Sequence, residues 1–451
     1  MEKNMSTGSP LSIILKFSLP LFIGNLFQSF YNMVDAMIVG RFVGEDALAA
    51  VGATGTIMFV VTGLATGLST GFTVLTSQKY GEGNEEGTRK SVANGMVLSL
   101  IMVLALTVIS LACMNPILKL MNTPDNIFED ASTYITAICI GMVSIVAYNF
   151  FAACLRAVGN SRIPLITLII SASINVALDL LFIRGFGWGV AGAAWATNLA
   201  QAVSAVICAL YLCRKKKSMW PRLKELRLNR KFSRQQLQVG VPMALQFGIT
   251  GSGTVIMQAA VNLFGSTAVA AYSTAGKITT LLMQGSIAIG QTMATYAGQN
   301  YGAKRPDRIR LGVRYAVGMN VVYSLCAAVL SNVGLPLFMQ LFFDAQADMT
   351  QVLYFSRRYI SICSMFYLPL SVIFTFRNTM QGCGYGLLPM LGGVVELVAR
   401  LICAVVAMHT LSYTAACLCD PVAWLCAGIF TMIGYFIVMR NVEQSGFRES
   451  D

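Results

Sequence analysis

Long apolar stretches recur along the whole chain, and they constrain its fold more than any other feature. Windows of about 18 or more mainly apolar residues follow one another with short polar connections, and a helix of that length can cross a membrane. The composition agrees, because 56% of the 451 residues are hydrophobic and only 12% are charged. A soluble protein of this size is less apolar. The sequence therefore predicts a polytopic membrane protein without a separate soluble domain.

Twelve membrane-spanning helices are predicted, so the expected fold class is an all-α polytopic membrane protein. An even number of spans places both termini on the same side of the membrane. The predicted spans are residues 14–39, 47–76, 91–113, 132–154, 163–183, 189–212, 237–264, 269–297, 312–334, 352–376, 387–409 and 418–439.

Basic residues lie mostly on one side of these spans. About 25 of the 32 Lys and Arg residues fall on the side of the termini and 5 on the other side. Lys and Arg accumulate in cytoplasmic loops, so we expect both termini in the cytoplasm and a location in a bacterial-type inner or plasma membrane. Nearly a third of them lie between Arg214 and Arg234, next to a span. Topology thus explains the net charge of +12 without a nucleic-acid partner.

Few residues are suited to enzyme or metal chemistry. The twelve cysteines mostly lie inside apolar runs, which indicates small packing residues and no disulfide framework. His409 is the single histidine, and the chain has no zinc-binding spacing, phosphate-binding loop or serine nucleophile motif. We therefore expect no enzyme, no organic cofactor and no metal other than the Na⁺ considered below.

The two halves of the chain repeat each other. Pro20 and Pro242 end matching segments, and Phe42 to Ala50 matches Phe264 to Ala271 at an offset of 221 to 222 residues. Three further matches are Gln78-Lys-Tyr-Gly81 with Gln299-Asn-Tyr-Gly302, Gly159 with Gly384, and Pro164 with Pro389. Each half has six spans, so the repeat is parallel, about an axis along the membrane normal. We expect an N-terminal lobe at 1–213, a basic cytoplasmic linker at 214–236 and a C-terminal lobe at 237–451.

Prolines and glycines mark two of the early helices. Pro20 and Pro242 remove a backbone donor inside the first helix of each half, and we expect kinks that serve either movement of the lobes or packing alone. Gly63, Gly67 and Gly71 form a ridge of small residues at intervals of four, which is typical of close helix packing.

One acidic residue interrupts the first span. Asp35 lies in the apolar run from Phe30 to Arg41, and a carboxylate near the middle of a membrane helix costs about 2.5 to 3.5 kcal/mol. Such a residue is kept with a partner or for a task. The alternative is an aspartate near the helix end that reaches the lipid headgroups.

Other polar residues are predicted at the same depth. Asp35 precedes Arg41, at the outer end of its span, by six residues, or about 9 Å along a helix. Asp179 lies at a similar depth in the fifth span, and Asn175 shares its helix face because it is four residues earlier. Thr197, in the sixth span, is as far from the outer end as Asn175. Three helices thus present oxygen atoms in one layer.

This layer has the chemistry of a cation site. Two carboxylates in a low dielectric disfavour joint ionisation, so Asp35 and Asp179 should share a proton or hold a cation. Oxygen ligands alone suit H⁺ or a hard ion such as Na⁺ and not a soft metal. The expected site comprises Asp35, Asn175, Asp179 and Thr197.

The second half has no comparable set of residues. Met257 stands at the repeat position of Asp35, and the intramembrane charges that we single out in this half are Lys277, Glu396 and Arg400. Glu396 and Arg400 are spaced i and i+4, so a structural ion pair is the simplest interpretation. Lys277 either joins that network or faces a central cavity.

With these residues in this order, the chain resembles the multidrug and toxic compound extrusion family from about Leu15 to Arg440. The likeness rests on Val34-Asp35 with Gly40-Arg41 and Ala47-Leu-Ala-Ala50, on Arg156-Ala-Val-Gly159 with Pro164, on Gln299-Asn-Tyr-Gly-Ala303, and on Gln381-Gly-x-Gly384 with Pro389. The resemblance implies an antiporter that uses an inward H⁺ or Na⁺ gradient. It would expel lipophilic, often cationic compounds through a cleft between two alternating lobes.

The resemblance also assigns roles to residues. Asp35, Asn175, Asp179 and Thr197 match the first-lobe cation site of the prokaryotic branch in which that lobe does the coupling. Another branch has an acid on the seventh helix, and Gln246 to Thr250 has none here. Our candidates for the substrate cleft are Tyr31, Asn32, Lys277 and Gln284.

Other functions remain as alternatives. A flippase for lipid-linked precursors, in the wider superfamily, should line its cleft with several Arg or Lys, and only Lys277 is a plain candidate. A membrane enzyme would need a nucleophile, an acid pair or a metal set near one interface, and a channel would not need two alternating lobes. We expect small amphipathic substrates, the lipid bilayer and no obligate protein partner.

Overall fold

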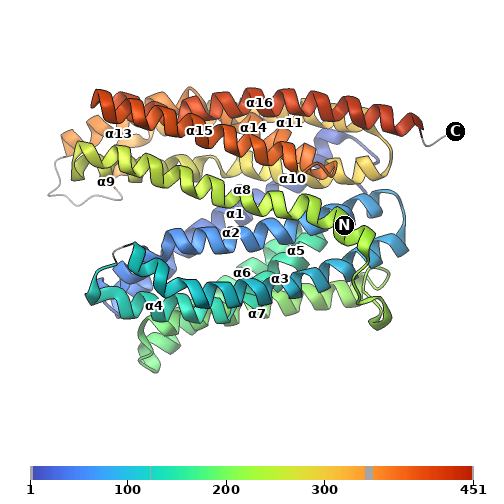
Figure 1. Ribbon diagram of the computed structural model, residues 1–451, viewed down its shortest axis with the longest axis horizontal. Coiled ribbons are helices and arrows are strands. Elements are labelled where there is room, and N and C mark those ends of the chain that lie inside the picture. Colours follow the sequence, from blue (N-terminus) through green and yellow to red (C-terminus); the bar gives the residue numbers. More distant parts are fainter. Residues whose placement is uncertain (1–3, 122, 341–348, 449–451) are drawn as a thin grey trace. The chain divides into compact units, whose positions relative to one another are not determined.

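The computed structural model describes residues 4–121, 123–340 and 349–448, which form helices and no β-strand (Figure 1). The chain divides into two compact units. The first lobe contains Ile23–Phe247, and the second contains Met5–Phe22 and the chain from Gly248 onward. The predicted all-α fold with two repeated lobes is confirmed.

Helices of the first lobe follow the predicted spans closely. They are the second part of α1 (Pro10–Phe42), α2 (Glu45–Gly81), α3 (Glu85–Leu120), α4 (Asp125–Ile140), α5 (Met142–Ala157), α6 (Arg162–Asp179) with the π-helical turn η1 (Leu180–Gly185), α7 (Gly189–Lys215), the 3₁₀ turn η2 (Leu223–Glu225) and the first part of α8 (Arg230–Val261).

Helices of the second lobe repeat this order. They are the first part of α1, the second part of α8 with the 3₁₀ turn η3 (Asn262–Phe264), α9 (Ser266–Leu282), α10 (Gln284–Gly302), α11 (Pro306–Val333), the short α12 (Leu335–Gln340), α13 (Met349–Ser364), α14 (Tyr367–Gly382), α15 (Leu387–Thr410) and α16 (Tyr413–Arg448). In Figure 1, α14, α15 and α16 run alongside one another.

The described helices account for all twelve predicted spans. Nine are long and apolar enough to cross a membrane, and two bent pairs bring the number to eleven. The pairs are α4 with α5 and α13 with α14, each bent by 49°. They correspond to the predicted spans 132–154 and 352–376. The twelfth predicted span, 269–297, consists of α9 and α10, which are separated at Met283.

The lobes exchange parts of their opening helices. Pro20 and Pro242 lie inside α1 and α8, and each helix passes from one lobe to the other soon after its proline, at Phe22 and Phe247. The predicted lobe boundaries, 1–213 and 237–451 with a linker at 214–236, lie elsewhere. By contacts, the start of α1 belongs to the second lobe, and both the linker and the start of α8 belong to the first.

Close packing of α2 against α8 explains why the start of α8 belongs to the first lobe. A Cβ atom at Gly67 would lie 2.7 Å from backbone atoms of Ala244, and one at Gly71 would lie 2.3 Å from the Cα of Gly240. Backbones come this close only where a side chain is missing. The predicted role of this glycine ridge in packing is confirmed.

The start of α1 belongs to the second lobe because its apolar side chains are buried there. Ile14 and Phe17 pack in one core with Met293 and Tyr296 of α10. A periodic apolar face of this kind supplies most of the stability of a packed helix.

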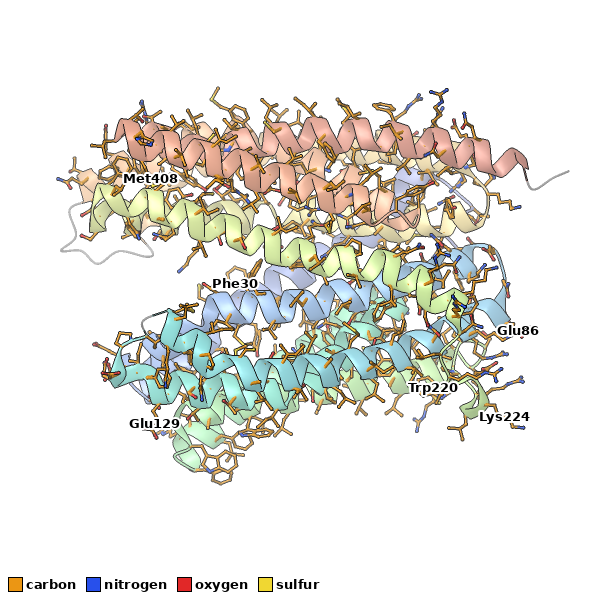
Figure 2. All side chains as sticks on the ribbon, viewed as in Figure 1. Phe30, Glu86, Glu129, Trp220, Lys224 and Met408 are labelled. Atoms are coloured by element: carbon orange, nitrogen blue, oxygen red, sulfur yellow. The ribbon has the colours of Figure 1, made fainter. Side chains whose placement is uncertain are left out.

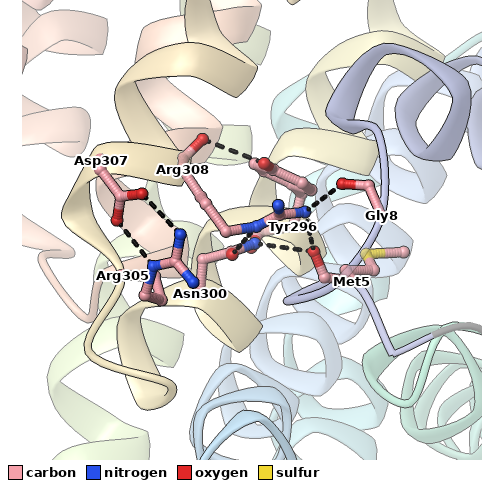
Figure 3. Close-up of polar contacts among 7 residues, drawn as sticks. All are labelled: Met5, Gly8, Tyr296, Asn300, Arg305, Asp307 and Arg308. Carbon is pink, nitrogen blue, oxygen red and sulfur yellow. Dashed lines mark hydrogen bonds and ion pairs between the residues drawn. The ribbon is translucent and has the colours of Figure 1, made fainter.

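The segment before α1 is also fixed to the second lobe (Figure 3). The Met5 amide donates to Gln299 Oε1 at 2.8 Å, and the Met5 carbonyl accepts from Asn300 Nδ2 at 3.3 Å and from Arg308 Nη2 at 3.1 Å. The same Arg308 nitrogen donates to the Gly8 carbonyl at 3.0 Å. Residues of the Gln299-Asn-Tyr-Gly302 motif thus hold the segment that precedes the first helix.

The basic linker is attached to the first lobe. Arg89 pairs with Glu225 at 2.8 Å, and Gln236 Nε2 donates to the carbonyls of Phe72 at 3.0 Å and Ser91 at 2.9 Å. These bonds hold the linker against the ends of α2 and α3.

Labelled residues show which loops lie at the same end of the first lobe (Figure 2). Glu86, Trp220 and Lys224 lie at one end, and Glu129 lies at the opposite end. The loop between α2 and α3 and the basic linker are therefore on the same side, as alternating spans require.

Candidate cation site in the first lobe

The site begins with an acid on α1. The helix continues without interruption past Asp35, whose side chain is half-buried. Its Oδ1 atom is buried and accepts no hydrogen bond from the described residues, and no ion pair joins it to a basic residue among them. A buried carboxylate oxygen without a donor is costly, which is typical of a functional group.

The second acid lies where α6 changes its geometry. Asn175 and Asp179 are both fully buried on one face of the helix. The α-helical geometry ends at Asp179, and the π-helical turn Leu180–Gly185 follows. Such turns are rare and frequent at functional sites. The sequence indicated a continuous span here, because no residue type marks a π-helical turn.

The carboxyl groups of Asp35 and Asp179 interact directly with each other. Beside them, Asn175 Nδ2 donates to Thr197 Oγ1 on α7 across a long 3.4 Å contact. Tyr31, one turn before Asp35, forms a side-chain hydrogen bond with Thr197 and lies in the field of both acids. The four residues expected from their depth in the membrane are thus brought together, and Tyr31 joins them.

One member of the cluster, a tyrosine on α4, was not predicted from the sequence. Tyr134 on α4 is 8% exposed and lies close enough to Asp35 and Asp179 to interact electrostatically with both. A tyrosine in an apolar run cannot be told from a core residue by spacing alone. The signal available was its phenolic oxygen, which a buried tyrosine must pair.

A second polar residue fixes the helix that carries Tyr134. Asn198, next to Thr197 on α7, donates through Nδ2 to the carbonyl of Ala137 at 2.7 Å. A Cβ at Gly141 would lie 2.0 Å from Asn198, so only glycine fits at the break between α4 and α5.

This arrangement can hold a proton or a hard cation. It combines two carboxylates, an amide and three hydroxyl groups, which are all oxygen donors to a cation. Among the described residues no group of three or more His, Cys, Asp or Glu side chains forms a metal cluster. The donor set suits Na⁺ or H⁺, because either cation relieves the repulsion between the carboxylates of Asp35 and Asp179.

The residues proposed for the substrate cleft lie in different places. Tyr31 belongs to the acid cluster, and the exposed Asn32 accepts a hydrogen bond from Gln28 at 3.1 Å. In the second lobe, Gln284 is half-buried at the start of α10, and Lys277 on α9 is exposed. Lys277 forms no ion pair with the described residues. It stays outside the network of Glu396 and Arg400.

That network has a third member that the sequence analysis did not include. Arg400 pairs with Glu396 at 2.6 Å and with Asp420 of α16 at 3.0 Å, and all three side chains are largely buried. The partner of Arg400 across the helix interface could not be found by helical spacing, which detects only i, i+3 and i, i+4 pairs.

Two repeated six-span lobes with ionisable side chains buried inside the spans define a membrane transporter. The MatE family matches residues 20–181 and 242–406, so the chain belongs to this family. It is 28% identical over 381 residues to a probable multidrug resistance protein, YoeA, of Bacillus subtilis, covering 83% of this chain and 81% of that protein.

Other relatives and solved structures agree with this assignment. The chain is 25% identical over 387 residues to a probable multidrug resistance protein, NorM, of Thermotoga maritima, which covers 84% of this chain and 81% of that protein. A solved outward-facing multidrug resistance MATE transporter matches with a TM-score of 0.91 at 22% identity, over 97% of this chain and 98% of that one. This likeness shows the same fold.

Proposed function

We propose that the protein is a secondary active multidrug exporter that exchanges lipophilic or cationic compounds for H⁺ or Na⁺. The observation that carries the proposal is the direct interaction of Asp35 and Asp179, from two helices, with Asn175 and Thr197 beside them. Tyr31 and Tyr134 complete the coupling site. The relatives named as multidrug resistance proteins support the substrate class.

Repulsion between the two acids supplies the coupling. With no cation present, joint ionisation of Asp35 and Asp179 is unfavourable, and the energy depends on how closely α1 approaches α6. A bound proton or Na⁺ removes this penalty and lets α1 pack differently around Pro20. Alternating access follows if the two lobe arrangements differ in cation affinity, since a ligand shifts an equilibrium only by its differential affinity.

A flippase for lipid-linked precursors is less well supported. Binding of a large anionic head group calls for several cationic side chains that can reach it. Of the two cations singled out within the second-lobe spans, Arg400 is already paired with two acids, and Lys277 is exposed without an ion pair to the described residues.

The test is export from proteoliposomes with an H⁺ gradient or a Na⁺ gradient imposed separately. The native protein should accumulate a cationic dye or drug under at least one gradient, and Asp35→Asn should not. Asp46→Asn is the matched control, because Asp46 is exposed at the start of α2 and bonds only Asn126 among the described residues. Equal export by Asp35→Asn and Asp46→Asn would refute the coupling site.

A further inference from the structure

The repeat allows the coupling site of the first lobe to be located in the second. The helices α5 and α14 both begin after a 49° bend, at Gly141 and Phe366, which are 225 residues apart. Pro164 and Pro389 have the same separation. The offset of 225 therefore holds from α4 through α6, and the offset for α1 is 222, as Pro20 and Pro242 show.

At these offsets the five site residues on α1, α4 and α6 have counterparts. Tyr134 corresponds to Tyr359, Asn175 to Arg400 and Asp179 to Ala404. On the opening helices, Asp35 corresponds to Met257 and Tyr31 to Gly253. The second lobe thus has neither acid of the first site but has an arginine in place of its amide.

Arg400 occupies this position with well-formed contacts. Its Nη2 lies 2.6 Å from Glu396 Oε1, and its Nε lies 3.0 Å from Asp420 Oδ1. The Tyr359 hydroxyl donates to the other oxygen of Asp420 at 3.4 Å. Two carboxylates and a tyrosine, the kinds of group that make up the first-lobe site, thus lie around the guanidinium group of Arg400.

A glycine on α8, the first helix of the second half, leaves room for this guanidinium group. A Cβ at Gly253 would lie 2.8 Å from Arg400 Nη1 and 3.1 Å from its Cδ. The tyrosine that stands here in the first lobe could not fit. Beside the cluster, the ring of Tyr272 packs on Tyr359 with centroids 4.6 Å apart, and its buried hydroxyl has no hydrogen-bond partner in the described part of the chain.

We propose that the cluster of Glu396, Arg400 and Asp420 is the second lobe's counterpart of the cation site, filled by the chain's own guanidinium group. Arginine stays charged at any working pH and cannot leave. This cluster therefore takes up no exchangeable ion, and the number of coupling ions per cycle is set at the first-lobe site. This last consequence rests on the proposed function, whereas the site itself does not.

Removal of Arg400 should open a binding site for a soluble cation. Arg400→Ala leaves two buried carboxylates and the vacated volume of a guanidinium group, so the variant should be much less stable than the native protein. Guanidinium ion at millimolar concentration, far below denaturing levels, should bind there. A ligand that binds only the folded state raises its stability.

The experiment measures the unfolding temperature of purified Arg400→Ala during titration with guanidinium chloride, against sodium chloride at equal ionic strength. The control is Arg310→Ala, which removes an exposed pair with Glu443 in the same lobe. We expect saturable recovery of most of the lost unfolding temperature for Arg400→Ala and none for Arg310→Ala. An equal response of the two variants would overturn the proposal.

A second variant covers poor folding of the first. Arg400→Ala with Asp420→Asn keeps the formal charge of the native cluster and one carboxylate, and it should also respond to guanidinium. If both variants fail to fold even when guanidinium is present throughout purification, the proposal is refuted, because a soluble cation should replace the lost side chain. The same titration with Asp35→Asn and Asp179→Asn added must give the same response, so this test stands or falls independently of the proposed coupling site.

Discussion

The two lobes share one helical plan but treat buried charge in opposite ways. In the first lobe, Asp35 and Asp179 face each other, and the cluster contains no arginine or lysine among the residues described around it. In the second lobe, Glu396 and Asp420 are both paired with Arg400. A repeated fold can thus contain one acid pair without a basic partner among the described residues and one acid pair bridged by a guanidinium group of the chain itself.

The proposed coupling site and the proposed arginine-filled site would give two structurally related lobes different roles. A buried acid pair without an internal cation depends on solution ions for its stability, and that dependence is what an antiporter needs. A buried ion cluster of fixed composition serves structure, because breaking it leaves an uncompensated charge.

The largest effect is expected at Asp35. Asp35→Asn removes an ionisable group from the cluster with almost no change of volume, so gradient-driven export should be abolished while the protein stays folded in the membrane. Transport in proteoliposomes and elution as a single species in detergent measure the two properties. Export at the native rate under an imposed gradient would show that the first lobe is not the coupling lobe.

The next effect concerns conversion of second-lobe residues into their first-lobe counterparts. Gly253→Tyr should lower stability through overpacking by about 1 to 3 kcal/mol, and Arg400→Asn by about 3 to 5 kcal/mol through a broken buried ion cluster. Together they should cost less than the sum, by about 0.5 to 3 kcal/mol, because the tyrosine fills the space that the guanidinium group leaves.

Thermal unfolding of the two single variants and the double variant measures this coupling. Gly248→Tyr is the control on the same helix, since a Cβ at Gly248 meets nothing within 4 Å. Additive losses for Gly253 and Arg400 would mean that the two positions do not share one site.

A smaller effect is expected at Lys277. Because this residue is exposed and forms no ion pair with the described residues, Lys277→Ala should change substrate preference by a few-fold, equivalent to about 1 kcal/mol, and leave stability and coupling unchanged. Lys277→Arg should retain the native preference. Export of several cationic and neutral compounds by each variant provides the comparison, and loss of cation binding by a folded Lys277→Ala would refute this placement.

The smallest effect lies outside the membrane, where the linker meets the first lobe. The hydrogen bond from Arg89 holds the pKa of Glu225 below its ordinary value. A lowered folded-state pKa stabilises the protein above the unfolded pKa of about 4.3, and this contribution is lost as pH falls through the folded value. Glu225→Gln should therefore lower the unfolding temperature near neutral pH, by the equivalent of at most about 1 kcal/mol, and match the native protein in acid.

A double variant checks the cause of that effect. In an Arg89→Ala background, Glu225→Gln should have almost no further effect near neutral pH. A pH-independent difference between the native protein and Glu225→Gln would mean that packing, and not the ion pair, is responsible.

Much of the fold could be predicted because membrane insertion leaves strong periodic signals. Apolar length predicted twelve spans, of which eleven are matched by helices or bent helix pairs long and apolar enough to cross a membrane, and repeated motifs revealed the two related lobes. The exchange of the first parts of α1 and α8 was not predictable, since it depends on backbone contacts such as that between Gly71 and Gly240. The bend at Phe366 had a sequence signal that the prediction of one continuous span did not use, since Pro369, three residues later, cannot donate a backbone hydrogen bond across the break.

The candidate site was predictable to the extent that depth in the membrane locates polar residues. Counting from the ends of helices placed Asp35, Asn175, Asp179 and Thr197 in one layer, and the structure brings these four together. Tyr134 was missed because burial hides a tyrosine among apolar neighbours. Asp420 escaped notice because its contact with Arg400 joins two different helices.

The central claim is that cation and substrate compete through the acid pair of the first lobe, and affinity measurements on purified protein test it most directly. Affinity for a cationic drug would be measured across pH, with and without Na⁺, for the native protein and for Asp35→Asn with Asp179→Asn. The native affinity should fall as H⁺ or Na⁺ rises, by about 5- to 150-fold for a coupling of 1 to 3 kcal/mol, and the double variant should show a constant affinity. A native affinity that stays constant in both titrations would contradict the account, because a cation without differential affinity for two states cannot drive exchange.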